Sequence, residues 1–193
     1  MESAQLVSDV QRLTDSLGQL PEPVAEPKFI VVSGLPGTGK SYFCNQLAKR
    51  LPFVILESDA LRKILFPSPS YSSQESSNLF QTIHLLVERL LKRGISLILD
   101  ATNLSELYRE YLYSIADRLS VKLVLVRVEA PPQVVYERLK SRQVNQQGKS
   151  DADWTVYQKM KSSVQHIRRN HYAVDTSRDI TPVLDKIARE VRH

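Results

Sequence analysis

Residues 34–41 read Gly-Leu-Pro-Gly-Thr-Gly-Lys-Ser, which fits the pattern G-x-x-x-x-G-K-S of a phosphate-binding loop. An apolar run over residues 29–32 precedes this stretch and predicts a buried strand, and a helical pattern over residues 42–51 follows it. In that context glycines let the backbone wrap closely around an anion, and N–H groups at the helix start point at it. The stretch therefore predicts a nucleoside triphosphate site rather than a plain glycine-rich turn.

The last residues of the stretch define its chemistry. Lys40 is expected to reach the β- and γ-phosphates of ATP, and the Ser41 hydroxyl to hold Mg²⁺. Lysine and serine after the final glycine also argue against a dinucleotide-binding fingerprint, which has a further glycine instead. Nucleotide contacts are expected from Gly34, Pro36, Gly37, Thr38, Gly39, Lys40, Ser41 and Tyr42.

The composition limits the cellular compartment and the binding partners to be expected for this protein. A single cysteine, Cys44, excludes a disulfide framework within the chain. No apolar run is long enough to span a bilayer and the N-terminus lacks a signal-peptide pattern, so we expect a cytoplasmic protein without a membrane partner. The net charge of +5 suits phosphate-bearing partners but is too small to establish nucleic-acid binding.

The chain is expected to have an N-terminal helix ahead of one domain. Apolar residues recur at helical spacing within residues 1–20, and three prolines in residues 21–27 exclude a helix there. We therefore expect a helix over 1–20, a proline-rich linker over 21–27 and a nucleotide-binding domain over 28–193. The helix could pack on that domain, form an oligomer or bind a partner protein.

From residue 28 onward, predicted strands and helices alternate. This alternation predicts an α/β fold of three layers, with a five-stranded parallel sheet and helices on both faces. Ligands in such sheets bind at the carboxyl ends of the strands, so residues after each strand are site candidates. Strands are predicted over residues 29–32, 53–56, 95–99, 121–128 and 172–174. Helices are predicted over residues 39–51, 60–66, 77–93, 105–119, 132–142, 153–167 and 181–192.

The third strand end distinguishes between classes of nucleotide-binding protein. Asp100 follows the apolar run 95–99 and is predicted to assist Mg²⁺ binding. The next residue is Ala101, whereas ATP-hydrolysing motors usually place a glutamate there to activate water. No N/T-K-x-D guanine signature follows the phosphate-binding loop, which disfavours a GTPase. These features favour a phosphotransferase that gives the γ-phosphate to a bound acceptor.

The second strand end supplies a candidate general base. Asp59 and Arg62 lie three residues apart at the start of a predicted helix, so both can face one site. Asp59 could accept the acceptor's hydroxyl proton, and Arg62 could bind the acceptor or stabilise the transferring group. In the alternative interpretation Ser58 or Asp59 only caps the helix and Arg62 is a surface residue.

Further candidates flank the same edge of the sheet. Thr102 and Asn103 follow Asp100 and could orient an acceptor, although Asn103 could equally cap the next helix. A helix that ends in Arg138 and Arg142, followed by a polar segment, predicts a lid over about residues 138–153 that brings arginines onto the ATP phosphates and excludes water. The alternative is a solvated basic helix face.

Together these motifs resemble one family. G-x-P-G-x-G-K-S, then D-x-x-R, then D-A-T-N-L and R-x-x-x-R before S-D-A are similar to P-loop kinases that include 5′-hydroxyl polynucleotide kinases, an ATP-binding, AAA-type small kinase module. The resemblance covers about residues 28–178. It implies a kinase-like P-loop NTPase fold with five parallel strands and ATP-dependent transfer to a hydroxyl. It also implies Asp59 as general base, Arg62 on the acceptor side, Arg142 as lid arginine, and Lys40 with Ser41 as the residues that bind the nucleotide. Thr176 follows the last predicted strand, where the loop borders the adenine in this fold, and is expected as a further nucleotide contact.

The sequence is compatible with more than one phosphoryl acceptor. The aspartate that directly precedes the T-N pair in polynucleotide kinases is replaced by Ala101, and the acid stands one residue earlier as Asp100. A one-residue shift at a strand end turns a side chain to the other face, so Asp100 is assigned to the metal. The first hypothesis is transfer to a polynucleotide 5′-hydroxyl of RNA or DNA. The second is transfer to a small metabolite, antibiotic or protein side chain, and the third is a regulatory ATPase switch.

Overall fold

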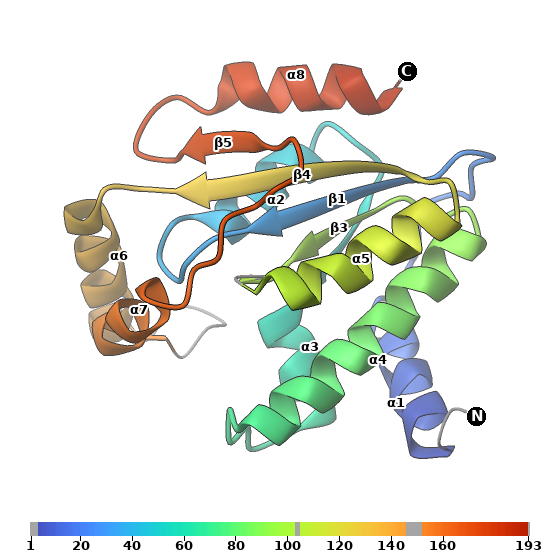
Figure 1. Ribbon diagram of the computed structural model, residues 1–193, viewed down its shortest axis with the longest axis horizontal. Helices are drawn as coiled ribbons and strands as arrows, with labels where there is room; N and C mark the ends of the chain where they lie inside the picture. Colours follow the sequence, from blue (N-terminus) through green and yellow to red (C-terminus); the bar gives the residue numbers. More distant parts are fainter. Residues whose placement is uncertain (1–3, 103–104, 146–151, 193) are drawn as a thin grey trace.

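The computed structural model describes residues 4–102, 105–145 and 152–192. Its centre is a five-stranded parallel sheet in the order β2-β3-β1-β4-β5 (Figure 1). The predicted number and direction of the strands are confirmed. The strands are β1 (Lys28–Ser33), β2 (Val54–Glu57), β3 (Leu97–Asp100), β4 (Lys122–Glu129) and β5 (Tyr172–Asp175).

Helices cover both faces of this sheet, as the predicted three-layer arrangement requires (Figure 1). Along β1, alternate side chains enter opposite cores: Phe29 and Val31 pack with α1, α3, α4 and α5, whereas Ile30 and Val32 pack with α2 and α8. The helices are α1 (Ala4–Ser16), α2 (Lys40–Ala48), α3 (Ser58–Leu65), α4 (Ser73–Lys92), α5 (Glu106–Arg118), α6 (Pro132–Asn145), α7 (Trp154–Lys161) and α8 (Thr181–Arg192).

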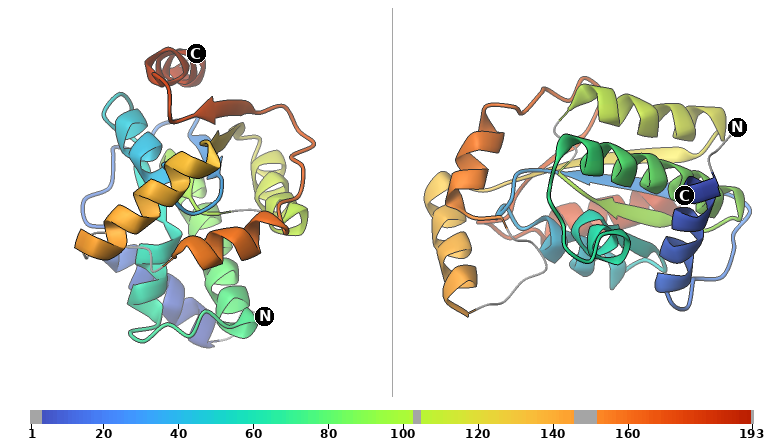
Figure 2. Two further views of the ribbon diagram at one scale, coloured as in Figure 1. Left: turned by 90° about the vertical axis from the view of Figure 1, so that its left-hand side faces the viewer. Right: turned by 90° about the horizontal axis from the view of Figure 1, so that it is seen from below.

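Helix α1 packs on its own chain. Val10 and Leu13 are buried against α3 and α4, and the Arg12 guanidinium donates to the carbonyl of Ile64 near the end of α3, at 2.7 Å. Figure 2, seen from below, shows α1 beside α4. This contact matches the first of the three alternatives for the N-terminal helix.

Among the helices after residue 28, two boundaries differ from the sequence-based prediction by more than three residues. Helix α4 begins at Ser73 rather than at residue 77, because the Ser72 hydroxyl accepts from the Glu75 N–H and caps it. The predicted helix over residues 153–167 ends at Lys161. Its apolar residue Ile167 is instead buried in the core cluster that includes residues of α4 and α5, so the chain leaves the helix to reach that core.

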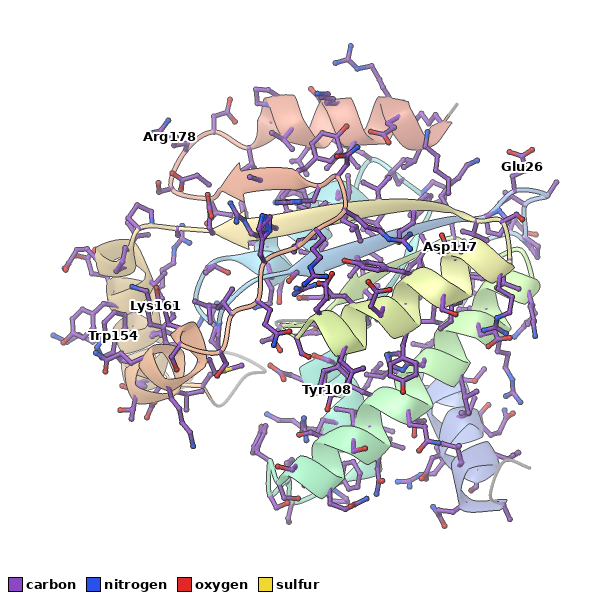
Figure 3. All side chains as sticks on the ribbon, in the orientation of Figure 1. Glu26, Tyr108, Asp117, Trp154, Lys161 and Arg178 are labelled. Atoms are coloured by element: carbon purple, nitrogen blue, oxygen red, sulfur yellow. The ribbon has the colours of Figure 1, made fainter. Side chains whose placement is uncertain are left out.

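Helices α6 and α7 stand at the carboxyl ends of the strands, where the lid was predicted (Figure 1). They share a small core of Val135, Leu139 and Tyr157, against which Leu35 of the phosphate-binding loop packs. Trp154, labelled in Figure 3, stacks on Tyr157 with ring centroids 4.8 Å apart. The part of the predicted lid over residues 146–151 lies outside the described residues.

Candidate nucleotide and acceptor site

A cavity of about 240 Å³ opens at the carboxyl ends of β1, β2 and β3. It brings together the phosphate-binding loop, the start of α3 and the end of β3, each of which carries residues that the sequence predicts to form a site. A larger cavity of about 610 Å³ lies by the first residues of β1 and β4. Since parallel α/β sheets bind ligands at their carboxyl ends, we assign the site to the smaller cavity. Its lining residues are Pro36, Gly37, Gly39, Lys40, Ser41, Asn45, Glu57, Ser58, Asp59, Asp100, Ala101, Thr102 and Arg142.

Lys40 provides the central positive charge of this cavity. Its ammonium group donates to the carbonyl of Leu35 at 3.1 Å, which holds the side chain across the loop. Burial lowers the pKa of Lys40, and the carboxylates of Asp100 and Asp59 oppose that shift. The Lys40 ammonium group is therefore coupled electrostatically to a carboxylate of β3 and one of α3, and both of these line the cavity.

Asp100 and Ser41 fit a magnesium site. The Ser41 hydroxyl hydrogen-bonds to the buried Asp100 carboxylate. Burial raises the pKa of Asp100 above its usual value, and the contacts with Lys40 and Ser41 offset only part of this shift. Among the described residues, no group of three His, Cys, Asp or Glu side chains could hold a metal ion alone. This donor set suits Mg²⁺, which takes one or two protein oxygens and completes its shell with water and phosphate oxygens.

Asp59 reaches the cavity from the first turn of α3. Its helix starts directly after β2, so the strand end and helix start carry Glu57, Ser58 and Asp59 to the same wall. Glu57 is paired in register with Asp100 on the adjacent strand. Glu57, Ser58 and Asn45 were not predicted as site residues; the rule that ligands bind at strand carboxyl ends would have included Glu57.

The lid contributes two arginines in different ways. Arg142 lines the cavity. Arg138 instead donates to the Thr176 hydroxyl at 2.8 Å, to the Thr176 carbonyl at 3.0 Å and to the Thr38 carbonyl at 3.3 Å. The Thr176 hydroxyl also donates to the Thr38 carbonyl. Arg138 therefore ties α6 to the phosphate-binding loop and to the loop after β5.

Some predicted site residues lie outside the cavity lining. Arg62 is buried and forms an ion pair with Glu75 of α4. Tyr42 projects to solvent with 57% of its surface exposed. Gly34 is buried, and its N–H donates to the carbonyl of Thr102 at 3.1 Å, which ties the loop to the end of β3. Asn103 lies outside the described residues.

The fold and the cavity define a P-loop NTPase with the topology of a small kinase. Residues 29–167 match the AAA_33 family, described as an AAA domain, and the chain belongs to that family. No curated protein matches the chain.

Solved structures share the fold over most of their length. An APS kinase from Mycobacterium tuberculosis, in complex with AMPPNP and APS, superposes with a TM-score of 0.67 at 16% identity, covering 89% of this chain and 100% of that one. A gluconokinase from Sinorhizobium meliloti gives 0.61 at 22% identity, covering 86% and 96%. Kti12 from Chaetomium thermophilum, in complex with ADP-AlF3, gives 0.66 at 19% identity, covering 83% and 97%. At these identities the likeness concerns the fold alone.

Proposed function

We propose that this protein is an ATP- and Mg²⁺-dependent phosphotransferase whose acceptor is a hydroxyl group. The observation that carries the proposal is the shared cavity. One cavity is lined by the candidate nucleotide-binding residues Lys40 and Ser41, the candidate base Asp59, the lid arginine Arg142 and Asp100. Each of these side chains has a role in phosphoryl transfer, which depends mainly on positioning and on electrostatic stabilisation.

The residues divide the reaction between them. Asp59 accepts the hydroxyl proton as the acceptor oxygen bonds to the γ-phosphorus and the bond to the β–γ bridging oxygen breaks, leaving ADP. Lys40 and Arg142 balance the negative charge of the phosphoryl group in transit. Ser41 and Asp100 would hold Mg²⁺, which when bound neutralises charge on the β- and γ-phosphate oxygens. Arg138 keeps α6 over the loop, which favours exclusion of water.

Two acceptor classes are supported by different observations. The motif D-x-x-R formed by Asp59 and Arg62 supports a polynucleotide 5′-hydroxyl, through its resemblance to polynucleotide kinases. The pairing of Arg62 with Glu75 supports a small molecule, because it leaves that arginine occupied within the protein. The names of two structural neighbours, an APS kinase and a gluconokinase, also point toward small acceptors.

An acceptor screen with γ-labelled ATP tests the proposal. Oligonucleotides with 5′-hydroxyl ends and a panel of small hydroxyl compounds are incubated with wild-type protein and with Lys40→Ala. We expect label on one acceptor class with wild-type protein and none with Lys40→Ala. Label found only in free phosphate would overturn the transfer reaction and favour a regulatory ATPase.

A further inference from the structure

A buried ion pair joins the helix that carries Asp59 to helix α4. Arg62 and Glu75 are only 7% and 8% exposed, and an Arg62 Nη1–H donates to the Glu75 carboxylate. Nη2 donates to the Ser76 hydroxyl at 3.2 Å. Since a buried charge is costly unless it is paired and hydrogen-bonded, each partner fixes the place of the other.

The same carboxylate holds the loop that leads into α4. Glu75 accepts from the Ser70 N–H at 2.6 Å, the Ser70 hydroxyl at 2.8 Å and the Tyr71 N–H at 3.3 Å. Burial alone would raise the pKa of Glu75, but the bonds from Ser70 and Arg62 lower it to about 2. The charged carboxylate of Glu75 therefore joins α4 to both α3 and the loop.

Tyr71 closes this network from the loop side. Its backbone has the left-handed φ of 54°, which is uncommon for a residue other than glycine. That conformation accompanies a cation–π contact in which the Arg62 guanidinium carbon lies 4.9 Å from the centre of the Tyr71 ring. The loop therefore contacts both members of the buried pair.

Asp59 depends on this arrangement through its helix. It lies three residues before Arg62 on α3, so the two side chains stand on neighbouring turns of the same helix face. Helix α3 has only eight residues, and Arg62 in its second turn is tied to α4. A shift at Arg62 is thus passed to Asp59 at the cavity.

We propose that Glu75 is a positioning residue for phosphoryl transfer, which fixes α3 so that Asp59 meets the acceptor hydroxyl. The inference rests on the proposed function. It assigns Arg62 the role of a counter-ion in the helix support rather than of a group that touches the acceptor. Nucleotide binding by the P-loop does not depend on this support, because the loop is tied to β3, β5 and α6 instead.

The first test compares Glu75→Gln with Glu88→Gln. Glu75→Gln keeps an oxygen acceptor but removes the charge that holds Arg62, whereas Glu88, on the same helix, forms surface ion pairs with Lys92 and Arg118. We expect kcat for transfer to fall about 10-fold or more in Glu75→Gln, since small misplacements of reacting groups have large effects on rate. The dissociation constant for ATP should change less than about twofold, and Glu88→Gln should match wild type.

A second variant covers the case in which Glu75→Gln fails to fold. Arg62→Met combined with Glu75→Gln removes both charges, a replacement that buried ion pairs often tolerate. Hydrogen exchange at the Ser70 and Tyr71 amides reports the loop in either variant without any need for activity. Faster exchange there and reduced kcat in folded protein would support the positioning role.

Two different results would contradict the role of Glu75 and the proposed phosphotransferase function. Wild-type kcat in a folded variant that lacks the charge pair would overturn the role of Glu75 and leave the proposed function intact. Absence of transfer by wild-type protein to every acceptor would overturn the proposed function, and the positioning role with it.

Discussion

Gly37 joins the phosphate-binding loop to the lid without room for a side chain. Its φ is +78°, and a Cβ placed there would lie 2.8 Å from a methyl group of Val135 and 2.9 Å from Leu139 Cγ. Both are buried residues of α6. At the scale of single residues, the glycine therefore serves two purposes: it allows the loop to curve around phosphate, and it allows the lid helix to pack directly on the loop.

We predict that Gly37→Ala is more damaging than Gly18→Ala. Both positions have a left-handed φ, but a Cβ at Gly18 (φ +66°) meets nothing within 4 Å. Both variants incur backbone strain of about 1 kcal/mol, and overpacking at Gly37 adds about 1–3 kcal/mol. Urea unfolding should show the difference, and calorimetry should show weaker ATP binding for Gly37→Ala alone. Equal losses in the two variants would contradict the close packing of lid and loop.

The sequence predicted residues that line the cavity more readily than the contacts these residues make with distant parts of the chain. The P-loop and Asp59 were predicted because a strand end and a helix start lie next to them in the chain. The pairing of Arg62 with Glu75 was not predicted, because it depends on how the loop over residues 66–72 folds back. Ser72 and Glu75 do form an S-x-x-E pattern, which is a signal for a helix start, but Glu75 turns its carboxylate to Ser70 and Arg62.

Helix α4 places one titratable side chain, His84, at its contact with α5. His84 lies on α4 beside Phe80, and its ring stacks on Tyr111 of α5 with centroids 5.4 Å apart. Tyr108, labelled in Figure 3, stacks on Phe80 at 5.1 Å and extends the same aromatic contact. Burial between these rings lowers the pKa of His84 from 6.5 to about 4. The α4–α5 contact therefore holds a neutral histidine at neutral pH.

We predict that His84 makes the protein less stable in mild acid. The unfolded state takes up a proton near pH 6.5 and the folded state only near pH 4, so stability is complete above pH 6.5 and falls between those values. The loss should approach about 3 kcal/mol. Unfolding measured from pH 7 to 4 should show a shallower decline in stability for His84→Phe than for wild type. Identical slopes in the two proteins would contradict a buried, neutral His84.

At the scale of the whole molecule, α1 completes a core that the P-loop domain shares. Helix α1 lies outside the family match over residues 29–167, yet Leu13 is fully buried in the cluster that contains β1, α3 and α4. These described contacts of α1 support its role as part of the domain. Separately, none of the helices in the part of the chain that the structure describes has the length and apolar character needed to span a membrane.

We predict that Leu13→Ala destabilises the protein by about 2–5 kcal/mol, because it leaves a cavity in this core. Val7 on the same helix is 44% exposed, so Val7→Ala should change the free energy of unfolding by less than about 0.5 kcal/mol. Urea denaturation measures both. A deletion of residues 1–20 that abolishes self-association but keeps wild-type stability would favour the alternative role as an assembly element.

The arrangement of the whole molecule was only partly predictable. Alternating apolar strands and helices predicted a parallel sheet with two covered faces, and the structure confirms it. The order β2-β3-β1-β4-β5 was not predicted, because strand neighbours depend on packing between distant segments. That order is what places Glu57 next to Asp100 and unites the strand ends in one cavity.

The proposed reaction depends on Asp59 as general base toward an acceptor bound beside the P-loop. The most direct measurement is single-turnover transfer of labelled phosphate to the best acceptor of the screen, in wild type, Asp59→Asn and Glu57→Gln. We predict that Asp59→Asn slows transfer about 10²–10⁴-fold with ATP affinity nearly unchanged. Transfer at the wild-type rate in Asp59→Asn would contradict the claim, and its loss in Glu57→Gln instead would assign the base to the neighbouring carboxylate.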